Sequence, residues 1–214
     1  MSDNLQTVLV LVLAWGVYAA IHSWLASLQL KRLVARRWPS FMPAYRLVFN
    51  GLAALLLIPL LWWSFTLPGP TLWQWKGGFW WLANGSALLA LLGVVWSMRD
   101  YDGGEFIGIR QWRDKEMAVG DQEGFHVSSL HRFVRHPWYS LSLVLIWTRD
   151  MDLAFFTSAA VMTIYFVIGA RLEEQKLIVY HGERYRRYRE MVPGLLPLPW
   201  RYLSREQAKE LQRI

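Results

Sequence analysis

The chain has 214 residues, of which 54% are hydrophobic and only 18% charged, with a net charge of +7, 14 Trp, 9 Tyr and no cysteine. Soluble chains carry about 25% charged residues, and Trp and Tyr concentrate at membrane–water interfaces, so this composition indicates an integral membrane protein. The absence of cysteine excludes disulfides, zinc–thiolate sites, iron–sulfur clusters and a thiol nucleophile. In a membrane chain the positive charge indicates loops beside anionic membrane lipids, and we expect no nucleic-acid partner.

Four long apolar segments and one short one predict the membrane helices, which are residues 5–28, 47–67, 79–98, 138–147 and 153–170. A helix needs about 20 apolar residues to span a bilayer, so the fourth segment is too short alone. We expect it to form a hairpin with the fifth, with residues 148–152 as the turn. No signal-peptide pattern is visible, because the first apolar run follows Asp3 rather than a basic residue. The prediction is an all-α polytopic membrane protein with about five transmembrane helices.

The basic residues give this protein an orientation. All but two of the 23 Lys and Arg residues fall in residues 29–46, 99–136 and 171–214, and the exceptions are Lys76 and Arg149. Positively charged loops stay on the cytosolic side, so these three segments are predicted to be cytosolic. The N-terminus then lies outside and the C-terminus inside. We expect the bacterial inner membrane as the location.

The densest group of chemically useful residues is Arg-His-Pro-Trp-Tyr at residues 135–139, at the cytosolic start of the hairpin. Pro137 suits the first turn of a helix, where its missing N–H costs nothing. This places Arg135 and His136 at the membrane boundary and turns Tyr139 into the helix bundle. The alternative is an interfacial anchor, because Arg, His, Trp and Tyr all favour that depth.

A second group, Arg-Leu-Glu-Glu at residues 171–174, lies at the cytosolic exit of the last helix. Adjacent carboxylates at a membrane boundary are costly unless they are solvated or paired with cations. A short hairpin returns both of its arms to the same face. We therefore expect Arg135 and His136 to lie near Glu173 and Glu174, the alternative being a solvated helix end.

The C-terminal segment carries two further patterns. Gly182, Tyr185 and Tyr188 are three residues apart, so both tyrosines share one helical face, although an amphipathic helix on the membrane surface has the same spacing. A short amphipathic helix is predicted over residues 204–214, with Ser204 as its N-cap and Gln207 at the capping-box position.

The motifs occur in an order that resembles a known family. Arg-His-Pro-x-Tyr, Glu-Glu-x-x-Leu, Gly-x-x-Tyr-x-x-Tyr and Val-Pro-x-x-x-Pro resemble the membrane methyltransferases related to isoprenylcysteine carboxyl methyltransferase and phospholipid methyltransferases. Upstream, His-Ser-Trp-Leu-Ala-Ser at 22–27, Tyr-Arg-Leu-Val-Phe-Asn at 45–50, and Asp102 followed by Phe-Ile-Gly at 106–108 and Gln111 resemble the NnrU and methanethiol S-methyltransferase branch.

The resemblance implies S-adenosylmethionine as cofactor, held in a cytosol-facing pocket. Methyl transfer from a sulfonium needs no metal, so we expect no metal site. His136, Pro137 and Tyr139 match the cofactor-binding His-Pro-x-Tyr, and Glu174, with Glu173 beside it, matches the acidic residue after the last helix. The cofactor-binding candidates also include Arg135, Tyr185 and His131, which stands where many relatives have tyrosine. Arg171 is near the family's substrate-side arginine, so the catalytic candidates are His136 and Arg171.

On this basis residues 1–214 are predicted to form a single integral membrane domain. Its parts are three N-terminal membrane helices (1–98), a cytosolic loop (99–136), the hairpin with the cofactor-binding signature (137–200) and an amphipathic tail (201–214). The predicted function is methyl transfer from S-adenosylmethionine to a small thiol or another lipophilic acceptor. The alternative is an NnrU-like accessory protein without catalysis that supports assembly of a respiratory or denitrification enzyme.

The chemistry agrees with a site of this kind. Methyl transfer from a sulfonium is an in-line displacement, and orienting donor and acceptor contributes about 7–11 kcal/mol to lowering the barrier. A thiol acceptor must lose its proton, since the thiolate is the nucleophile, and His136 and His131 are both candidate bases. His22, in the first helix, is a weaker candidate for haem ligation, because the other histidines all fall in cytosolic segments. A transporter is disfavoured, because few charged residues lie at mid-membrane depth.

Overall fold

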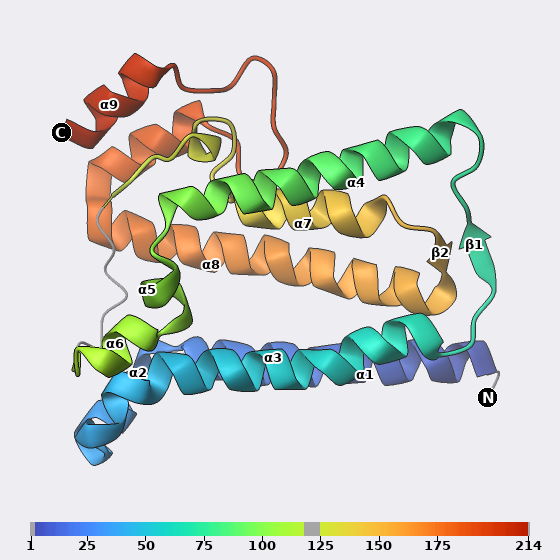
Figure 1. The fold of residues 1–214 in the computed structure, drawn as a ribbon, viewed down its shortest axis with the longest axis horizontal. Helices are drawn as coiled ribbons and strands as arrows, with labels where there is room; N and C mark the ends of the chain where they lie inside the picture. Colours follow the sequence, from blue (N-terminus) through green and yellow to red (C-terminus); the bar gives the residue numbers. More distant parts are fainter. Residues whose placement is uncertain (1–2, 118–124, 214) are drawn as a thin grey trace. The chain divides into compact units, whose positions relative to one another are not determined.

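The computed structural model describes residues 3–117 and 125–213 (Figure 1). The chain divides into two compact units. The first consists of Met1–Gln74, Tyr101–Asp121 and Asp150–Met162, and the second of Trp75–Asp100, Gln122–Arg149 and Thr163–Ile214. Each unit is described by itself below.

The first unit is built on two antiparallel membrane helices, α1 (Asp3–Ala26) and α3 (Met42–Thr66), which lie side by side (Figure 1). The start of α8 (Leu153–Met191) packs with them. The Ser64 hydroxyl donates to Ser158 Oγ at 2.7 Å inside this packing. The apolar core around this bond consists of Leu11, Trp15, Leu60 and Ala154.

The predicted turn at residues 148–152 contains a short strand. In the first unit, β2 (Met151–Asp152) pairs in antiparallel fashion with β1 (Thr71–Trp73). The Asp152 carboxylate then accepts from the backbone N–H of Phe155 at 2.8 Å, which satisfies one of the free donors at the start of α8. The sequence suggested only a turn here, because strands this short leave no periodic pattern of apolar residues.

Four of the described helices are long and apolar enough to cross a membrane, namely Asp3–Ala26, Pro39–Thr66, Gly78–Asp100 and Leu153–Met191. Large apolar side chains on them face outward, including Leu13, Trp62 and Leu89, which are 67%, 67% and 71% exposed. Side chains of this kind suit contact with lipid. The chain is therefore an integral membrane protein.

The fourth predicted membrane helix is present as α7 (Pro137–Trp147), but it has only 11 residues. At a rise of about 1.5 Å per residue it covers roughly 16 Å, about half of a hydrocarbon core of about 30 Å. It therefore does not cross a bilayer alone, in agreement with the short fourth segment read from the sequence.

Helical segments also occupy the polar connections of the first unit. They are α2 (Leu28–Arg37), which the sequence did not suggest, and α5 (Gly103–Ile107) with α6 (Ile109–Arg113). The side-chain amide of Asn50 donates to the carbonyls of Phe106 at 3.1 Å and Ile107 at 2.9 Å. Gly108 has φ +101°, and a Cβ there would lie 2.6 Å from the backbone nitrogen of Leu47. Two of the three upstream motifs, residues 45–50 and 102–111, thus pack directly against each other.

In the second unit, α4 (Gly78–Ser97) and α7 lie side by side (Figure 1). The indole N–H of Trp138 donates to Ser97 Oγ at 2.8 Å, which ties the start of α7 to the end of α4. At the other end of α7 the indole N–H of Trp147 donates to Thr163 Oγ1 of α8 at 3.0 Å. These two bonds fix α7 at both ends.

Gly182 divides α8 into residues 153–181 and 183–191, because its backbone has φ +55° and ψ −128° and is not helical. Residues 183–191 carry the rings of Tyr185 and Tyr188 into a core that also receives α9 (Arg205–Arg213). The predicted capping box at the start of α9 is confirmed, with Ser204 N donating to Gln207 Oε1 at 2.8 Å and Gln207 N donating to Ser204 Oγ at 3.1 Å.

Candidate active site

Four charged side chains of the second unit meet where the start of α7 lies against α8. Arg135 Nη2 is 2.7 Å and Arg135 Nε 2.8 Å from Glu174 Oε1, and His136 Nε2 is 3.1 Å from the same oxygen. Glu173 Oε2 lies 3.4 Å from His136 Nδ1. We call Arg135, His136, Glu173 and Glu174 the charge cluster. The structure thus brings together the two groups that the hairpin was expected to juxtapose.

The segment that follows α8 holds Arg135 from the other side. Arg135 Nη1 donates to the carbonyl of Val192, and the backbone N–H of Arg135 donates to the carbonyl of Pro193 at 2.9 Å. The backbone N–H of His136 donates to the carbonyl of Gly194 at 3.1 Å. The Val-Pro motif therefore supplies backbone acceptors to the charge cluster, a role that its apolar side chains did not reveal.

The charge state of His136 follows from this environment. Burial disfavours the imidazolium and would by itself lower the pKa of His136, but hydrogen bonds to the Glu173 and Glu174 carboxylates outweigh burial and raise the pKa above its ordinary value. Both ring nitrogens face carboxylate oxygens, which suits a ring with two N–H donors. The surroundings of His136 thus favour its protonated form, with a carboxylate beside each ring nitrogen.

An aromatic stack continues from the charge cluster between α7 and α8. The rings of His136 and Tyr139 are 5.6 Å apart at 11°, and those of Tyr139 and Phe166 are 5.0 Å apart at 6°. Pro137 occupies the first turn of α7, as expected, and is buried. Phe166 was not among the predicted residues, although it lies two helical turns before Glu173 on α8 and that spacing could have indicated it.

His131 lies in a different setting from His136. Burial first, and then the charges of His136 and His126, lower the pKa of His131 to about 4. Its Nδ1 is 2.8 Å from the hydroxyl of Ser128, and its backbone carbonyl accepts from the Tyr188 hydroxyl at 2.6 Å. His131 is thus neutral at pH 7 and bound to Ser128, a residue that the sequence did not single out.

The other two predicted residues differ in burial. Tyr185 is only 2% exposed, and its ring centroid is 5.7 Å from that of Tyr188. Arg171 is exposed on α8 one turn before Glu174, and within residues 3–117 and 125–213 it joins no ion pair of the charge cluster.

Comparison with known proteins places this geometry in a family. The chain is 32% identical over 92% of its length to a methanethiol S-methyltransferase from Mycobacterium tuberculosis (strain ATCC 25618 / H37Rv), covering 81% of that protein. It is 30% identical to methanethiol S-methyltransferase 2 of Bradyrhizobium diazoefficiens, with 90% of this chain and 74% of the relative aligned. The chain belongs to the methanethiol S-methyltransferase family. No family model and no solved structure matches it.

Membership establishes the chain as a membrane methyltransferase, which requires a methyl donor. In the described part of this methyltransferase, no group of three or more His, Asp or Glu side chains has the arrangement of a metal site. Its charge cluster brings two carboxylates, a guanidinium and the His136 ring into contact. Such groups can bind a ligand that itself carries both signs of charge.

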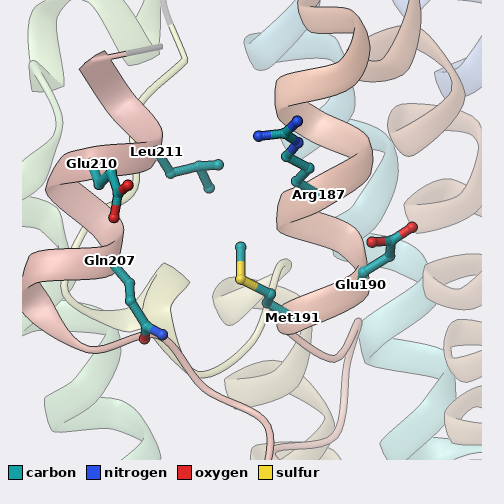
Figure 2. Close-up of a pocket in the computed structure, with 6 residues that line it drawn as sticks. All are labelled: Arg187, Glu190, Met191, Gln207, Glu210 and Leu211. Carbon is teal, nitrogen blue, oxygen red and sulfur yellow. The ribbon is translucent and has the colours of Figure 1, made fainter.

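This methyltransferase also has an open pocket of about 320 Å³ between residues 183–191 and α9 (Figure 2). Arg187, Met191 and Leu211 point into the gap between the two helices (Figure 2). The pocket is lined by Arg187, Glu190, Met191, Gln207, Glu210 and Leu211. None of these belongs to the charge cluster.

His22 lies in the first unit of this methyltransferase and is packed among aromatic rings. Its ring centroid is 5.7 Å from that of Tyr18 and 5.1 Å from that of Phe49. The other histidines belong to the second unit. Ring packing between α1 and α3 therefore accounts for the position of His22.

Proposed function

We propose that this chain is an S-adenosylmethionine-dependent methyltransferase that methylates a small thiol. The observation that supports this most directly is the charge cluster, in which residues about 39 positions apart, Arg135 and Glu174, are paired on one face of the α7–α8 hairpin. The names of the relatives support a thiol as the methyl acceptor, since these relatives are methanethiol S-methyltransferases.

The residues of the cluster and its neighbours fit the proposed donor. S-adenosylmethionine carries a sulfonium, an ammonium, a carboxylate and an adenine ring. Carboxylates suit the two cations, and Arg or protonated His suits the carboxylate, through charge-assisted hydrogen bonds. When bound, the donor supplies an activated methyl group on sulfur. The residues proposed to hold it are His131, Arg135, His136, Pro137, Tyr139, Glu173, Glu174 and Tyr185.

The role of this chain's own residues is to position the donor and the acceptor. Orientation of this kind is worth about 7–11 kcal/mol of barrier when the reacting atoms are held in line. Arg135 and His136 donate hydrogen bonds to backbone carbonyls, and Arg135 also donates to Glu174. The site is therefore organised before a ligand arrives. Arg171, exposed on α8, is proposed to face the acceptor.

Neither histidine fits the role of general base. Two carboxylates beside His136 raise its pKa and so favour its protonated form, and the pKa of His131, near 4, makes that histidine a weak base. The proposal therefore assigns the proton of the thiol to solvent, so the acceptor reacts as a thiolate. His136 is then a donor-binding residue rather than a base.

The proposed location is the bacterial inner membrane, with the charge cluster on the cytosolic face. The distribution of Lys and Arg supports this, because it places the N-terminus outside and the C-terminus inside. A cytosolic site also has direct access to a soluble nucleotide-like donor.

Calorimetry on the purified protein in detergent tests the proposal. We expect saturable binding of S-adenosylmethionine, and we expect Glu174→Gln and His136→Ala to weaken it at least tenfold. Gas chromatography with methanethiol and the labelled donor should detect labelled dimethyl sulfide. Absence of saturable binding of both the donor and S-adenosylhomocysteine would overturn the proposal and favour the accessory role. Unchanged binding in both variants would overturn the site.

A further inference from the structure

A non-helical segment connects α8 to α9 and lies against the charge cluster. We call this segment, residues 192–203, the strap. The backbone N–H of His136 donates to the carbonyl of Gly194 in the strap at 3.1 Å. A Cβ on Gly194 would lie 3.4 Å from Arg135 Nη2 and 3.9 Å from Glu174 Oε1. The backbone of the strap therefore packs directly on the paired charges.

Hydrogen bonds fasten the strap at both of its ends. Near its start, the hydroxyl of Ser140, in the first turn of α7, donates to the carbonyl of Leu195. At its end, the backbone N–H of Leu203 donates to the carbonyl of Arg132 at 2.9 Å, and Arg132 Nε donates to the carbonyl of Leu203 at 2.9 Å. The position of the strap is thus set by the fold of the second unit.

Between these fastened ends the strap exposes apolar and aromatic side chains. Leu196 is 70% exposed, Trp200 74% and Tyr202 52%. Trp200 lies in a turn, and the ring of Tyr202 stacks on that of Phe133, which is itself 44% exposed, with centroids 6.0 Å apart. The fold therefore holds a group of large apolar side chains on the outside of this unit.

The composition of the strap suits contact with a bilayer. It contains no Asp or Glu, and its one charged residue, Arg201, donates from Nη2 to the backbone carbonyls of Arg189 and Glu190. Pro197 and Pro199 carry no backbone N–H, so two donors that would be costly beside hydrocarbon are absent. Trp and Tyr concentrate at the level of the lipid headgroups. An exposed segment of this kind fits the membrane interface better than water.

The neighbouring helices show that the strap is continuous with the membrane-spanning part of this unit. Helix α4 is long and apolar enough to cross a membrane, and its end is tied to α7 by the bond from Trp138 to Ser97. One turn further into both helices, a Cβ on Gly93 of α4 would lie 3.2 Å from the side chain of Leu141 of α7. Ser140, which binds the strap, therefore lies at the level of the last turns of α4.

We propose that the strap binds the lipid bilayer, with Leu196 and Trp200 at the boundary between headgroups and acyl chains, and that this contact holds Gly194 on the charge cluster. The leaflet is the one on the side of the cluster. Apolar side chains of interfacial segments lie roughly 5–10 Å into this boundary. The inference goes beyond the proposed function and does not depend on it, because the partner is lipid and not the methyl donor.

A fluorescent label at position 200 tests the contact. The chain has no cysteine, so Trp200→Cys gives a single labelling site for an environment-sensitive fluorophore. The labelled protein is placed in lipid nanodiscs and quenched with phospholipids brominated near the headgroup end of their acyl chains, or with aqueous iodide. The control is Glu206→Cys, on the exposed face of α9 opposite its buried residues Ala208 and Leu211.

We expect brominated lipid to quench the label at position 200 at least about threefold more than the label at position 206, and iodide to show the reverse order. Leu196→Cys should behave like Trp200→Cys, so the result does not depend on the loss of one tryptophan. Quenching by iodide but not by brominated lipid at both strap positions would overturn the inference. Protection from both quenchers would also overturn it and indicate that a second protein copy covers the strap.

A double variant tests whether lipid contact holds the strap in place. In Leu196→Ser with Trp200→Ser, we expect backbone amides of residues 192–203 to exchange hydrogen at least about threefold faster in nanodiscs, because loss of the apolar contacts favours local opening. Mass spectrometry measures this exchange. The control is Leu172→Ser, at a 51% exposed position of α8 outside the strap, which should leave the exchange of residues 192–203 unchanged. Unchanged exchange in the double variant would overturn the role given to lipid in holding Gly194.

Discussion

Arg135 shows how one side chain organises the candidate site. Its guanidinium binds Glu174 through two nitrogens and the carbonyls of Arg189 and Val192 through a third. The planar fork of arginine serves several acceptors in fixed directions, which the single ammonium of lysine does not. Charge alone therefore does not describe what this residue does.

Arg135→Lys keeps the charge but loses the hydrogen bonds to the two carbonyls. We expect the free energy of unfolding to fall by about 2 kcal/mol, since each bond is worth about 1 kcal/mol. Thermal unfolding in detergent measures this change. Arg186→Lys is the control, because the Arg186 side chain is 56% exposed and should tolerate the change. An equal effect of both substitutions would contradict the role given to Arg135.

His131 makes stability depend on pH. Its pKa is about 4 in the folded protein, against an ordinary value of 6.5, because burial disfavours the charged ring. Between these values the unfolded chain binds a proton that the folded chain does not. The stabilisation is therefore present above about pH 6.5 and is lost as pH falls toward 4, by up to about 3 kcal/mol.

Unfolding temperatures measured from pH 7 down to pH 4.5 check this dependence. His131→Gln should flatten the decline, whereas His126→Gln, at an exposed position, should retain most of it, because burial is the largest cause of the low pKa of His131. A decline of the same steepness in His131→Gln would show that other groups cause it.

At the scale of elements, close backbone contact decides how the α5–α6 segment attaches to α3. Gly108 combines φ +101° with a space that admits no Cβ, because Leu47 N would be 2.6 Å away. Gly108→Ala is therefore expected to cost more than about 2 kcal/mol. Gly103→Ala, where a Cβ would meet no atom within 4 Å, is the control. Comparable unfolding temperatures for the two variants would refute this explanation of the motif.

Helix α9 depends on its N-terminal cap. Ser204→Ala removes the acceptor of the Gln207 N–H and should destabilise α9 by about 1 kcal/mol. Because α9 buries Ala208 and Leu211 against Tyr185 and Tyr188, we expect faster cleavage of the C-terminal segment in limited proteolysis. Ser204→Asp retains a capping oxygen and should restore the original cleavage rate.

For the whole molecule, the asymmetry of basic residues predicts one orientation in the membrane. A C-terminal green fluorescent protein should fluoresce and a C-terminal alkaline phosphatase should be inactive, because the basic segments stay in the cytosol. Phosphatase inserted after Lys76 should be active, and phosphatase inserted after Arg37 should be inactive. The reverse pattern would invert the proposed topology.

Much of the architecture could be predicted because it depends on residues close in sequence. The apolar runs gave the membrane helices, Pro137 gave the start of α7, and Ser204 with Gln207 gave the cap of α9. Helix α2 was missed, because this segment is rich in charged residues and contains no long apolar run. The strand pair β1–β2 was missed, because strands of three and two residues leave no periodic pattern.

The candidate site could be predicted only in part. A short hairpin returns its arms to one face, so the meeting of Arg135 with Glu174 followed from chain connectivity. Phe166 was missed, although its spacing of two helical turns from Glu173 could have indicated it. Ser128 was missed because a serine in a loop is common and carries no signal of its own. Their roles depend on which residues happen to face them.

The sequence, with its relatives, determined that this is a membrane methyltransferase whose polar motifs flank a hairpin, because composition, apolar length and motif order are properties of the chain. Only the tertiary structure decided that Glu174 is enclosed while Glu173 is open. The two residues are chemically identical neighbours, and their difference arises from the rotation of α8 against Arg135 and His136. That rotation is set by packing between segments far apart in sequence.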